Sequence, residues 1–403
     1  MTGHLHPVAI GQPNSADPQP PAVVYVVGAR PNFVKMAPVV REMRRRAPAA
    51  RHVVVHTGQH YDADMSGIFF DELGMPVPDH LLGVGSGSHA VQTARALERL
   101  EPVLEQVRPR AIVVPGDVNS TLSAALAAAK LQIPIAHLEA GLRSFDRTMP
   151  EEINRLLVDQ LAQWCFIHSM EAAEHLQREG IEKDRIRFVG NTMIDTLVQL
   201  RSRIAASTVH QEFGVEQHGY LLVTLHRPAL VDGPLLAPVL AGLAEVARSL
   251  PVVFPVHPRT RARLHRENLD APGVQFADPV GYIDFLALEA SAAAVLTDSG
   301  GIQEETTYLH VPCFTFRDNT ERPVTITQGT NKLLGLRPDV ISEIPRYIAE
   351  SPVRLHSPPG WDGHAAGRVA QALIDDLGLS APGEAAEVGL APNGDMTAIG
   401  ASA

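Results

Sequence analysis

The sequence predicts an α/β fold made of two Rossmann-like, doubly wound domains that face each other across a cleft. Three observations lead to this prediction. The chain has 403 residues, which is too long for one ordinary core and suits two domains of about 150–200 residues each. Short apolar runs alternate with amphipathic stretches, as in parallel strands joined by crossover helices. This alternation restarts near residue 219, so we expect two sheets in series.

The expected strands are short β-branched runs that end in glycine, proline or polar residues. In the first half they lie at 22–27, 52–57, 110–116, 134–141, 164–169 and 186–191. In the second half they lie at 220–226, 252–257, 273–276, 293–299 and 311–316. We expect helices between them, including one that follows the second strand through Leu73. The stretch 83–88 imitates a glycine-rich phosphate loop, but no clear strand leads into it, so we expect a flexible loop there.

Composition divides the chain into five parts. Both ends lack a strand or helix period and are rich in proline, glycine or other small and polar residues, so we expect disorder there. The predicted parts are a disordered extension at 1–21, an N-terminal domain at 22–205, a C-terminal domain at 206–363, a last helix at 364–379 that packs back toward the N-terminal domain, and a flexible tail at 380–403. The segment 202–218 has no strong apolar period and is the expected linker.

Composition also excludes several classes of protein. Hydrophobic residues make up 45% and charged residues 20% of the chain, the mix of a globular protein. The net charge is −11 and no long block of Lys or Arg occurs, so nucleic acid is not an expected partner. No apolar stretch reaches the roughly 18 residues of a membrane-spanning helix. The chain also lacks the basic start of a signal peptide, so we expect no membrane association and a cytoplasmic location.

No pattern in the sequence indicates a metal or a tightly bound cofactor. Cys165 and Cys313 lie far apart in apolar runs without metal-type spacing, so we expect two buried, unpaired thiols. No HExxH motif and no Walker lysine motif occur, and no GxGxxG follows the first strand. We therefore expect a reaction that uses neither metal nor cofactor.

Carboxylates occur at three consecutive strand-to-helix junctions, where open parallel sheets bind ligands. Asp117 either caps the next helix or acts in catalysis. Glu139 shares a strand face with His137 in a sheet that should be apolar, so it needs a function or a salt-bridge partner such as Arg143. Glu151 either stabilises a helix dipole or is a third acid. Neighbouring carboxylates raise one another's pKa, which suits acid–base catalysis.

Basic residues at other strand ends indicate an anion-binding site. Arg30 and Lys35 lie at a helix start after the first strand. Helix N-termini and cations bind phosphate, although both residues could equally be solvated cations. His226 and Arg227 end the first strand of the second half, where the pair would suit a phosphate or a leaving oxyanion.

The strongest single pattern is Ser299-Gly300-Gly301 between a strand and a helix. Glycines let a phosphate approach backbone N–H groups at the helix start, and the alternative is a tight turn before a capped helix. Glu305 follows on the same helix, where a carboxylate can accept hydrogen bonds from ribose hydroxyls. Arg322 follows another strand. The second half would therefore bind a nucleoside diphosphate, and the attached group would face the carboxylates.

Taken in order, these motifs resemble those of the non-hydrolysing UDP-N-acetylglucosamine 2-epimerases. The resemblance runs from about residue 22 to 375 and rests on GARPNFVKMAPV, TGQHYDADMS, PGDVNSTL, HLEAGLRS, MPEEINR, GNTMIDTL, TLHRP, PVHPRTR, LTDSGGIQEE and RDNTERP. It implies the GT-B fold, a homodimer and metal-free interconversion of UDP-GlcNAc and UDP-ManNAc. In that reaction UDP leaves as the C2 proton is lost, and UDP re-adds to 2-acetamidoglucal after a proton returns to the other face of C2.

The resemblance implies roles for individual residues. Asp117, Glu139 and Glu151 match the three catalytic acids, and His226 matches the histidine that contacts the diphosphate and aids its departure. The implied substrate-binding residues are Arg30, Lys35, Val280, Phe285, Ser299, Gly300, Gly301, Glu305 and Arg322. In this set Phe285 packs on uracil, and the backbone near Val280 reads the edge of the base.

The chain departs from the family pattern in three places. HRPALVDG lacks the Glu that many relatives have shortly after the HisArg pair. Some members bind a second UDP-GlcNAc as an activator through a glutamine pair. Here Gln59 remains but Asp62 stands three residues on, so we do not expect allosteric activation. The GARPN opening, in place of GTRPE, indicates a divergent subgroup whose sugar can carry other substituents.

Other functions remain open at this stage. A 2-epimerase of a modified UDP-HexNAc, such as a diacetamido-uronic acid, would need an extra Arg near Asp117 and Glu139. A hydrolysing variant would release UDP and ManNAc. An acceptor-dependent glycosyltransferase does not explain three acids, and a non-enzymatic UDP-sugar sensor would not need them.

Overall fold

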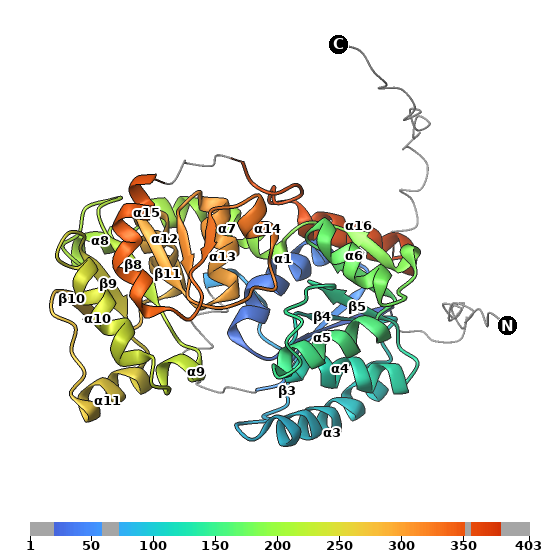
Figure 1. Cartoon of the computed structure of the whole chain (residues 1–403). Helices are drawn as coiled ribbons and strands as arrows, with labels where there is room; N and C mark the ends of the chain where they lie inside the picture. The colour runs from blue at the N-terminus through green and yellow to red at the C-terminus, as the bar shows by residue number, and fades with distance from the viewer. Residues whose placement is uncertain (1–19, 59–71, 351–355, 380–403) are drawn as a thin grey trace, which may run out of the picture.

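The computed structural model describes residues 20–58, 72–350 and 356–379 (Figure 1). The expected disorder at both ends of the chain therefore falls almost entirely outside the described residues. So does most of the helix expected to end at Leu73. Gln59 and Asp62 also lie outside them.

Two parallel sheets form the framework of the molecule (Figure 1). The first has the strand order β3-β2-β1-β4-β5-β6-β7 and the second has the order β10-β9-β8-β11-β12-β13. The strands of the first sheet are β1 Ala22–Val27, β2 Arg51–His56, β3 His80–Leu81, β4 Ala111–Pro115, β5 Ile135–Leu138, β6 Trp164–Ile167 and β7 Ile186–Phe188. Those of the second are β8 Leu221–Thr224, β9 Val252–Pro255, β10 Val274–Ala277, β11 Ala294–Thr297, β12 Cys313–Thr315 and β13 Asn331–Leu333.

Helices connect the strands and cover both sheets. Those between strands of the first sheet are α1 Arg30–Arg46, α3 His89–Val107, α4 Asn119–Lys130, α5 Pro150–Leu161, α6 Met170–Arg178 and the 3₁₀ turn η1 Lys183–Arg185. The helices that follow β7 are α7 Thr192–Ala206, α8 Val209–Glu212, α9 Pro228–Val231, α10 Leu236–Val246, α11 Pro258–Glu267, α12 Tyr282–Ala290, α13 Gly300–Leu309, α14 Val324–Thr327, the 3₁₀ turn η2 Pro338–Glu343, α15 Ile344–Glu350 and α16 Ala365–Leu377.

The strand order places the binding region of each sheet. The order reverses between β1 and β4 in the first sheet and between β8 and β11 in the second. Crevices open at the carboxyl ends of strands at such switch points, because the flanking helices there run in opposite directions away from the sheet. Every residue of β1 and β4 is buried, which explains why both read as continuous apolar runs. The predicted two-domain α/β fold is confirmed.

The structure differs from the expected elements in detail. β3 and β13 were not expected, because strands of two or three residues carry no readable period. β3 ends just before the stretch 83–88, so the expectation that no strand leads into this stretch was wrong. The strand expected at 134–141 ends at Leu138, so Glu139 lies beyond it. The expected linker at 202–218 contains the end of α7 and the whole of α8, and the predicted domain boundary within it stays a prediction.

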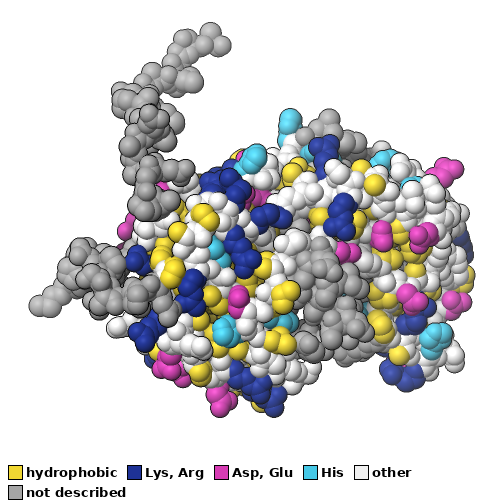
Figure 2. Space-filling model, turned by 180° about the vertical axis from the view of Figure 1, so that it is seen from behind, with side chains coloured by type: hydrophobic (Ala, Val, Ile, Leu, Met, Phe, Trp, Pro, Cys, Tyr) yellow, Lys and Arg dark blue, Asp and Glu magenta, His cyan; other side chains and the backbone are white. Residues whose placement is uncertain are grey.

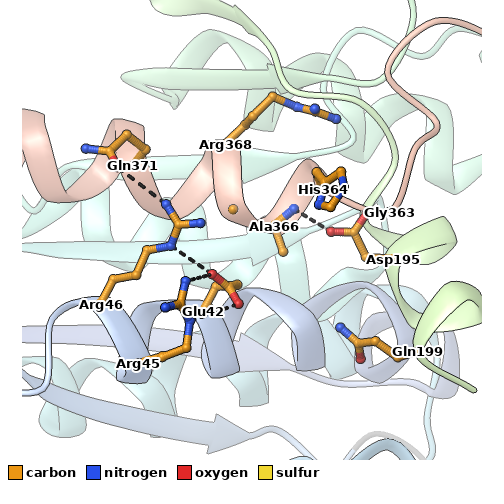
Figure 3. A pocket seen from close by; sticks show the side chains of 11 residues that line it. Glu42, Arg45, Arg46, Asp195, Gln199, Gly363, His364, Ala366, Arg368 and Gln371 are labelled. Carbon is orange, nitrogen blue, oxygen red and sulfur yellow. Dashed lines mark hydrogen bonds and ion pairs between the residues drawn. The ribbon is translucent and has the colours of Figure 1, made fainter.

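The last helix, α16, packs against α1 of the first sheet and against α7. Asp195 on α7 accepts a hydrogen bond from the backbone N–H group of Ala366 at 2.7 Å (Figure 3). It accepts a second one from the backbone N–H group of Ala365 at 3.1 Å. These donors belong to the first turn of α16, where no carbonyl of the helix itself can accept them. A single buried carboxylate therefore fixes the start of α16.

The surface and the buried cysteines agree with the composition. On the face shown in Figure 2, Lys and Arg side chains form separate groups with Asp and Glu between them. Within the described residues no helix is long and apolar enough to cross a lipid bilayer. Cys165 and Cys313 are buried and unpaired, as expected.

We predict that Asp195→Ala lowers the free energy of unfolding by about 2 kcal/mol, because two N–H groups of α16 lose their acceptor. Urea denaturation followed by circular dichroism would measure the change. Asp339→Ala, which removes an exposed carboxylate, is the matched control and should leave stability nearly unchanged. Equal stability of the two variants would contradict this account of α16.

Candidate active site

Glu139 lies at the carboxyl end of β5 in a constrained backbone conformation. Its φ of 69° falls in the left-handed region that residues other than glycine rarely adopt. Such conformations persist where surrounding contacts fix them, and they cluster at functional sites. The Glu139 carboxylate therefore does not follow the alternating side-chain directions of β5.

A buried network around Asp159 of α5 fixes this turn. The Asp159 carboxylate lies 2.7 Å from His137 Nδ1 and 2.7 Å from Arg143 Nη2, and it accepts a hydrogen bond from Gly141 N at 3.1 Å. Asp159, His137 and Arg143 are almost completely buried. Arg143, which was considered as a salt-bridge partner of Glu139, instead pairs with Asp159 and Glu179. That expectation was wrong, because the turn directs the two side chains apart.

Two cations hold Glu139. Lys35 of α1 forms a short ion pair with it, and Arg322, from the loop after β12, donates Nη2–H to Oε1 at 2.5 Å. Burial raises the pKa of Glu139, but Lys35, Arg322 and His168 outweigh it and lower the pKa to about 2. We expected neighbouring carboxylates to raise this pKa. For Glu139 that expectation was wrong, because cations from both halves of the chain surround it.

Asp117 follows β4 and Gly116, close to Glu139. A Cβ on Gly116 would lie 3.5 Å from both Glu139 Oε2 and Lys35 Nζ, so the two strand ends adjoin. Asp117 does not cap the next helix, because the N-cap residue of α4 is Val118 and no side chain caps it. Its carboxylate instead pairs with Arg155 of α5.

Glu151 is the second residue of α5. Its charge acts on Arg227, which follows β8. The Arg227 guanidinium donates Nε–H to the Asp298 carbonyl at 3.0 Å and lies 3.8 Å from Glu321. The third predicted acid therefore acts electrostatically on a residue of the second half.

Asp298, at the end of β11, organises the loop that carries His226. It accepts hydrogen bonds from the backbone N–H groups of His226 at 3.0 Å and of Arg227 at 2.8 Å. The His226 side chain is 55% exposed, and its Nδ1 lies 2.8 Å from Asp298 Oδ1. A histidine held by one ring nitrogen keeps the other available for a ligand.

Ser299, Gly300 and Gly301 form the start of α13. Ser299 is the N-cap residue, and its side chain makes no capping hydrogen bond. A Cβ on Gly300 would collide with the Arg322 guanidinium, so only glycine leaves room for this arginine. The first backbone N–H groups of α13 lie beside the side chain that reaches across to Glu139.

The remaining predicted residues lie along the second half, except Arg30, which is the first residue of α1. Glu305 of α13 is buried and accepts a hydrogen bond from the Tyr282 hydroxyl at 2.8 Å. Val280 precedes α12 and Phe285 lies on it, and both are partly buried. The structure therefore joins Lys35, Glu139 and Arg322 directly, while Glu305, Val280 and Phe285 lie on and beside α12 and α13.

Four further residues at the site were not identified as candidates from sequence. Arg155 pairs with Asp117, Asp298 orients His226, and His168 and Glu304 adjoin Glu139. Arg155, Asp298 and Glu304 belong to the quoted motifs MPEEINR and LTDSGGIQEE, so their positions gave a usable signal. One ligand atom each from Glu139, His168 and Glu304 lies within 4.8 Å of the others, a spacing that could hold a metal ion. Arg322 and Lys35 already supply positive charge there.

A separate cavity of about 550 Å³ lies between α1, α7 and α16 and contains none of the predicted site residues (Figure 3). Its cations already have carboxylate partners. Arg45 and Arg46 pair with Glu42, and Arg368 pairs with Asp362. This cavity belongs to the junction with α16.

We predict that Asp159→Asn lowers the free energy of unfolding by roughly 3 kcal/mol, because it leaves the buried Arg143 with only part of its compensating charge. Thermal or urea unfolding would measure this loss. Glu174→Gln, in an exposed pair with Arg178, should have almost no effect. If Asp159→Asn left the free energy of unfolding unchanged, the network would not support the turn at Glu139.

Comparison with known proteins identifies the family of the chain. The sequence model of the UDP-N-acetylglucosamine 2-epimerase family matches residues 41–374. The UDP-N-acetylglucosamine 2-epimerase of Methanocaldococcus jannaschii is 43% identical over 321 residues, 77% of this chain and 87% of that protein. The UDP-2,3-diacetamido-2,3-dideoxy-D-glucuronate 2-epimerase of Pseudomonas aeruginosa is 41% identical over 355 residues, 87% of this chain and 99% of that protein.

A solved structure gives the same answer for the fold. The crystal structure of Methanocaldococcus jannaschii UDP-GlcNAc 2-epimerase in complex with UDP-GlcNAc and UDP superposes with a TM-score of 0.81 at 38% sequence identity. The match covers 88% of this chain and 99% of that one. The sequence and the fold together show that this chain belongs to the UDP-N-acetylglucosamine 2-epimerase family.

Proposed function

We propose that this protein catalyses the reversible C2 epimerisation of UDP-GlcNAc to UDP-ManNAc by elimination and re-addition of UDP. The observation that carries the proposal is the contact between Glu139 and two cations, one of which comes from the opposite half beside the Ser299-Gly300-Gly301 helix start. This contact puts a carboxylate that can move a proton next to a site that can hold a diphosphate.

We assign binding of the nucleotide to the second half. The backbone N–H groups at the start of α13 would bind the diphosphate, with Arg322 beside them. Glu305 would accept hydrogen bonds from the ribose, with Phe285 and the backbone at Val280 at the base. His226, oriented by Asp298, would contact the diphosphate and stabilise the charge that develops as it leaves. Arg30 and Lys35 would complete the cationic surface from the first half.

We assign the proton transfers to Asp117, Glu139 and Glu151. Elimination needs a base to accept the C2 proton, and return of a proton to the opposite face of C2 needs an acid on that side. Asp117 comes from the junction between β4 and α4, while Glu139 and Glu151 lie at the start and at the end of the connection from β5 to α5. Arg155 fixes the orientation of Asp117.

The cations around Glu139 would couple substrate binding to proton transfer. A carboxylate with a pKa of about 2 is a weak base. When a diphosphate approaches, its oxygens would attract Lys35 and Arg322 and so weaken both ion pairs with Glu139. Its pKa then rises and it becomes a stronger base, so the catalytic group becomes effective only once the leaving group is in place.

The Pseudomonas aeruginosa relative favours a second candidate, a 2-epimerase of a UDP-diacetamido-uronic acid. Such a sugar carries an additional carboxylate that would need an extra cation near Asp117 and Glu139, besides Lys35 and Arg322, which already pair with Glu139. Arg155 lies there, but it is buried and already paired with Asp117 and Glu152. We therefore propose the neutral sugar first.

Incubation of the protein with UDP-GlcNAc in D₂O, without added metal or NAD, should give UDP-ManNAc and deuterium at C2 of both sugars. Proton NMR would record both at once. Accumulation of free UDP and ManNAc would indicate a hydrolysing enzyme instead. Turnover of the UDP-diacetamido-uronate alone would support the second candidate, and binding of UDP-sugar without any reaction would indicate a sensor.

We predict that Asp117→Asn, Glu139→Gln and Glu151→Gln each lower turnover by about 100-fold or more, because each removes a group that transfers or directs a proton. Isothermal titration calorimetry should show that all three still bind UDP, because the proposed nucleotide site is built from other residues. A fully active variant would remove that residue from the mechanism.

Two further expectations accompany this proposal. We propose that the protein acts as a homodimer, which light scattering would test. We also propose a cytoplasmic location, where UDP-sugars are available as substrates, and cell fractionation would test it.

A further inference from the structure

A buried histidine and a buried glutamate beside Glu139 have no role in the reaction described above. His168 follows β6 in the first half, and Glu304 lies on α13 in the second. They are only 2% and 1% exposed. His168 Nε2 lies 3.3 Å from Glu304 Oε1, so this contact connects the two halves alongside the contact between Glu139 and Arg322.

Ordinary structural contacts do not satisfy this pair. Among the described residues, neither ring nitrogen of His168 and neither carboxylate oxygen of Glu304 makes a well-aligned hydrogen bond. The histidine is otherwise held by packing, because its ring meets Trp361 edge-on with centroids 5.9 Å apart. Glu304 is held by charge instead, since its Oε1 lies 3.3 Å from His168 Nε2 and 2.9 Å from Arg322 Nε. Replacing buried charges by a well-packed apolar pair often stabilises a protein, which indicates that this pair has a function other than stability.

Arg322 links Glu304 to the proposed catalytic group. Its Nε lies 2.9 Å from Glu304 Oε1, while its Nη2 donates to Glu139 Oε1 at 2.5 Å. Glu321 Oε2 also lies 3.5 Å from Arg322 Nη1, so three carboxylates share one guanidinium. Of the three, Glu304 acts most strongly on the charge of Arg322.

We propose that Glu304 and His168 are positioning residues that set how tightly Arg322 holds Glu139. The inference rests on the proposed epimerase function and extends it. Glu304 attracts part of the charge of Arg322 and so weakens its hold on Glu139. His168 reaches Glu304 from the opposite half and offsets part of that attraction. When a diphosphate draws Arg322 away, the Nε contact with Glu304 keeps the side chain in the site.

Substitutions at the two positions should shift the pKa of Glu139 in opposite directions. The charged groups that act on this site are Lys35 from α1, Arg322, Glu304, Glu321 and Asp117. Burial lowers the pKa of His168, so it acts on Glu304 mainly as a neutral ring. Without the charge of Glu304, Arg322 holds Glu139 more tightly and the pKa of Glu139 falls. Without His168, Glu304 draws Arg322 more strongly, and the pKa of Glu139 rises.

The test is the pH dependence of kcat for Glu304→Gln and His168→Phe, the second of which keeps a ring against Trp361. The acid limb of the profile follows the pKa of the group that must be ionised to accept the proton. We expect this limb to move to lower pH in Glu304→Gln and to higher pH in His168→Phe. The plateau of Glu304→Gln should also fall severalfold, because a base with a lower pKa accepts the proton less readily.

Two control variants separate this role from a structural one. His168→Gln keeps an N–H donor toward Glu304, so its acid limb should lie closer to that of the wild type than that of His168→Phe. Glu289→Gln replaces another buried glutamate of the second half. Burial and the charge of Glu305 raise the pKa of Glu289 well above its ordinary value, so an amide leaves its charge unchanged and the profile should not move.

Acid limbs that move in the same direction in both variants, or that stay fixed while the melting temperature falls, would overturn the proposal. An inactive wild-type protein would instead contradict the proposed function. A second measurement then tests the effect on Glu139 without turnover. It is the NMR chemical shift of the Glu139 carboxyl ¹³C in the UDP-bound protein, and this signal is assigned by its absence from Glu139→Gln. Opposite shifts in Glu304→Gln and His168→Phe support the proposal, and identical shifts overturn it.

Discussion

The contact between Glu139 and Arg322 is the interaction on which the rest of the site depends. It joins the end of β5 in the first sheet to the loop after β12 in the second. A buried carboxylate is unfavourable unless opposite charge compensates it, so Glu139 keeps its position only while cations from both halves reach it. Gly300 leaves the space through which Arg322 passes, and the Asp159 network fixes the turn from which Glu139 projects. The site therefore depends on the relative position of the two sheets and not on one sequence motif.

This arrangement also explains why the charged residues occur at strand ends. In parallel sheets covered by helices on both faces, only the ends of the strands remain accessible to polar ligands. The central strands β1, β4 and β11 are buried, and polar residues occur where the chain leaves them toward a helix. Where the carboxyl ends of the strands of two sheets face each other, carboxylates from one sheet meet a helix start and cations from the other.

Much of this could be predicted from sequence because it is local. The longer strands are β-branched runs bounded by turn residues, and the motifs at their ends mark the carboxyl edge of each sheet. The short strands β3 and β13 could not be predicted, because two or three residues carry no period. The partners of Glu139 could not be predicted from spacing either, since Lys35 is 104 residues away and Arg322 is 183 residues away. The raised pKa expected for Glu139 was wrong for the same reason: the expectation counted nearby carboxylates and missed distant cations.

The position of α16 has a consequence for the order in which the protein folds during synthesis. Although the first sheet is built from the first half of the chain, its helix α1 is covered by residues 365–377. Arg110 donates a hydrogen bond to the Leu377 carbonyl, and the Trp164 indole donates to Asp376. A ribosome that has completed the last strand of the first sheet has therefore not yet made the helix that covers it. The apolar surface of α1 that α16 covers therefore stays exposed until the whole second sheet has been translated.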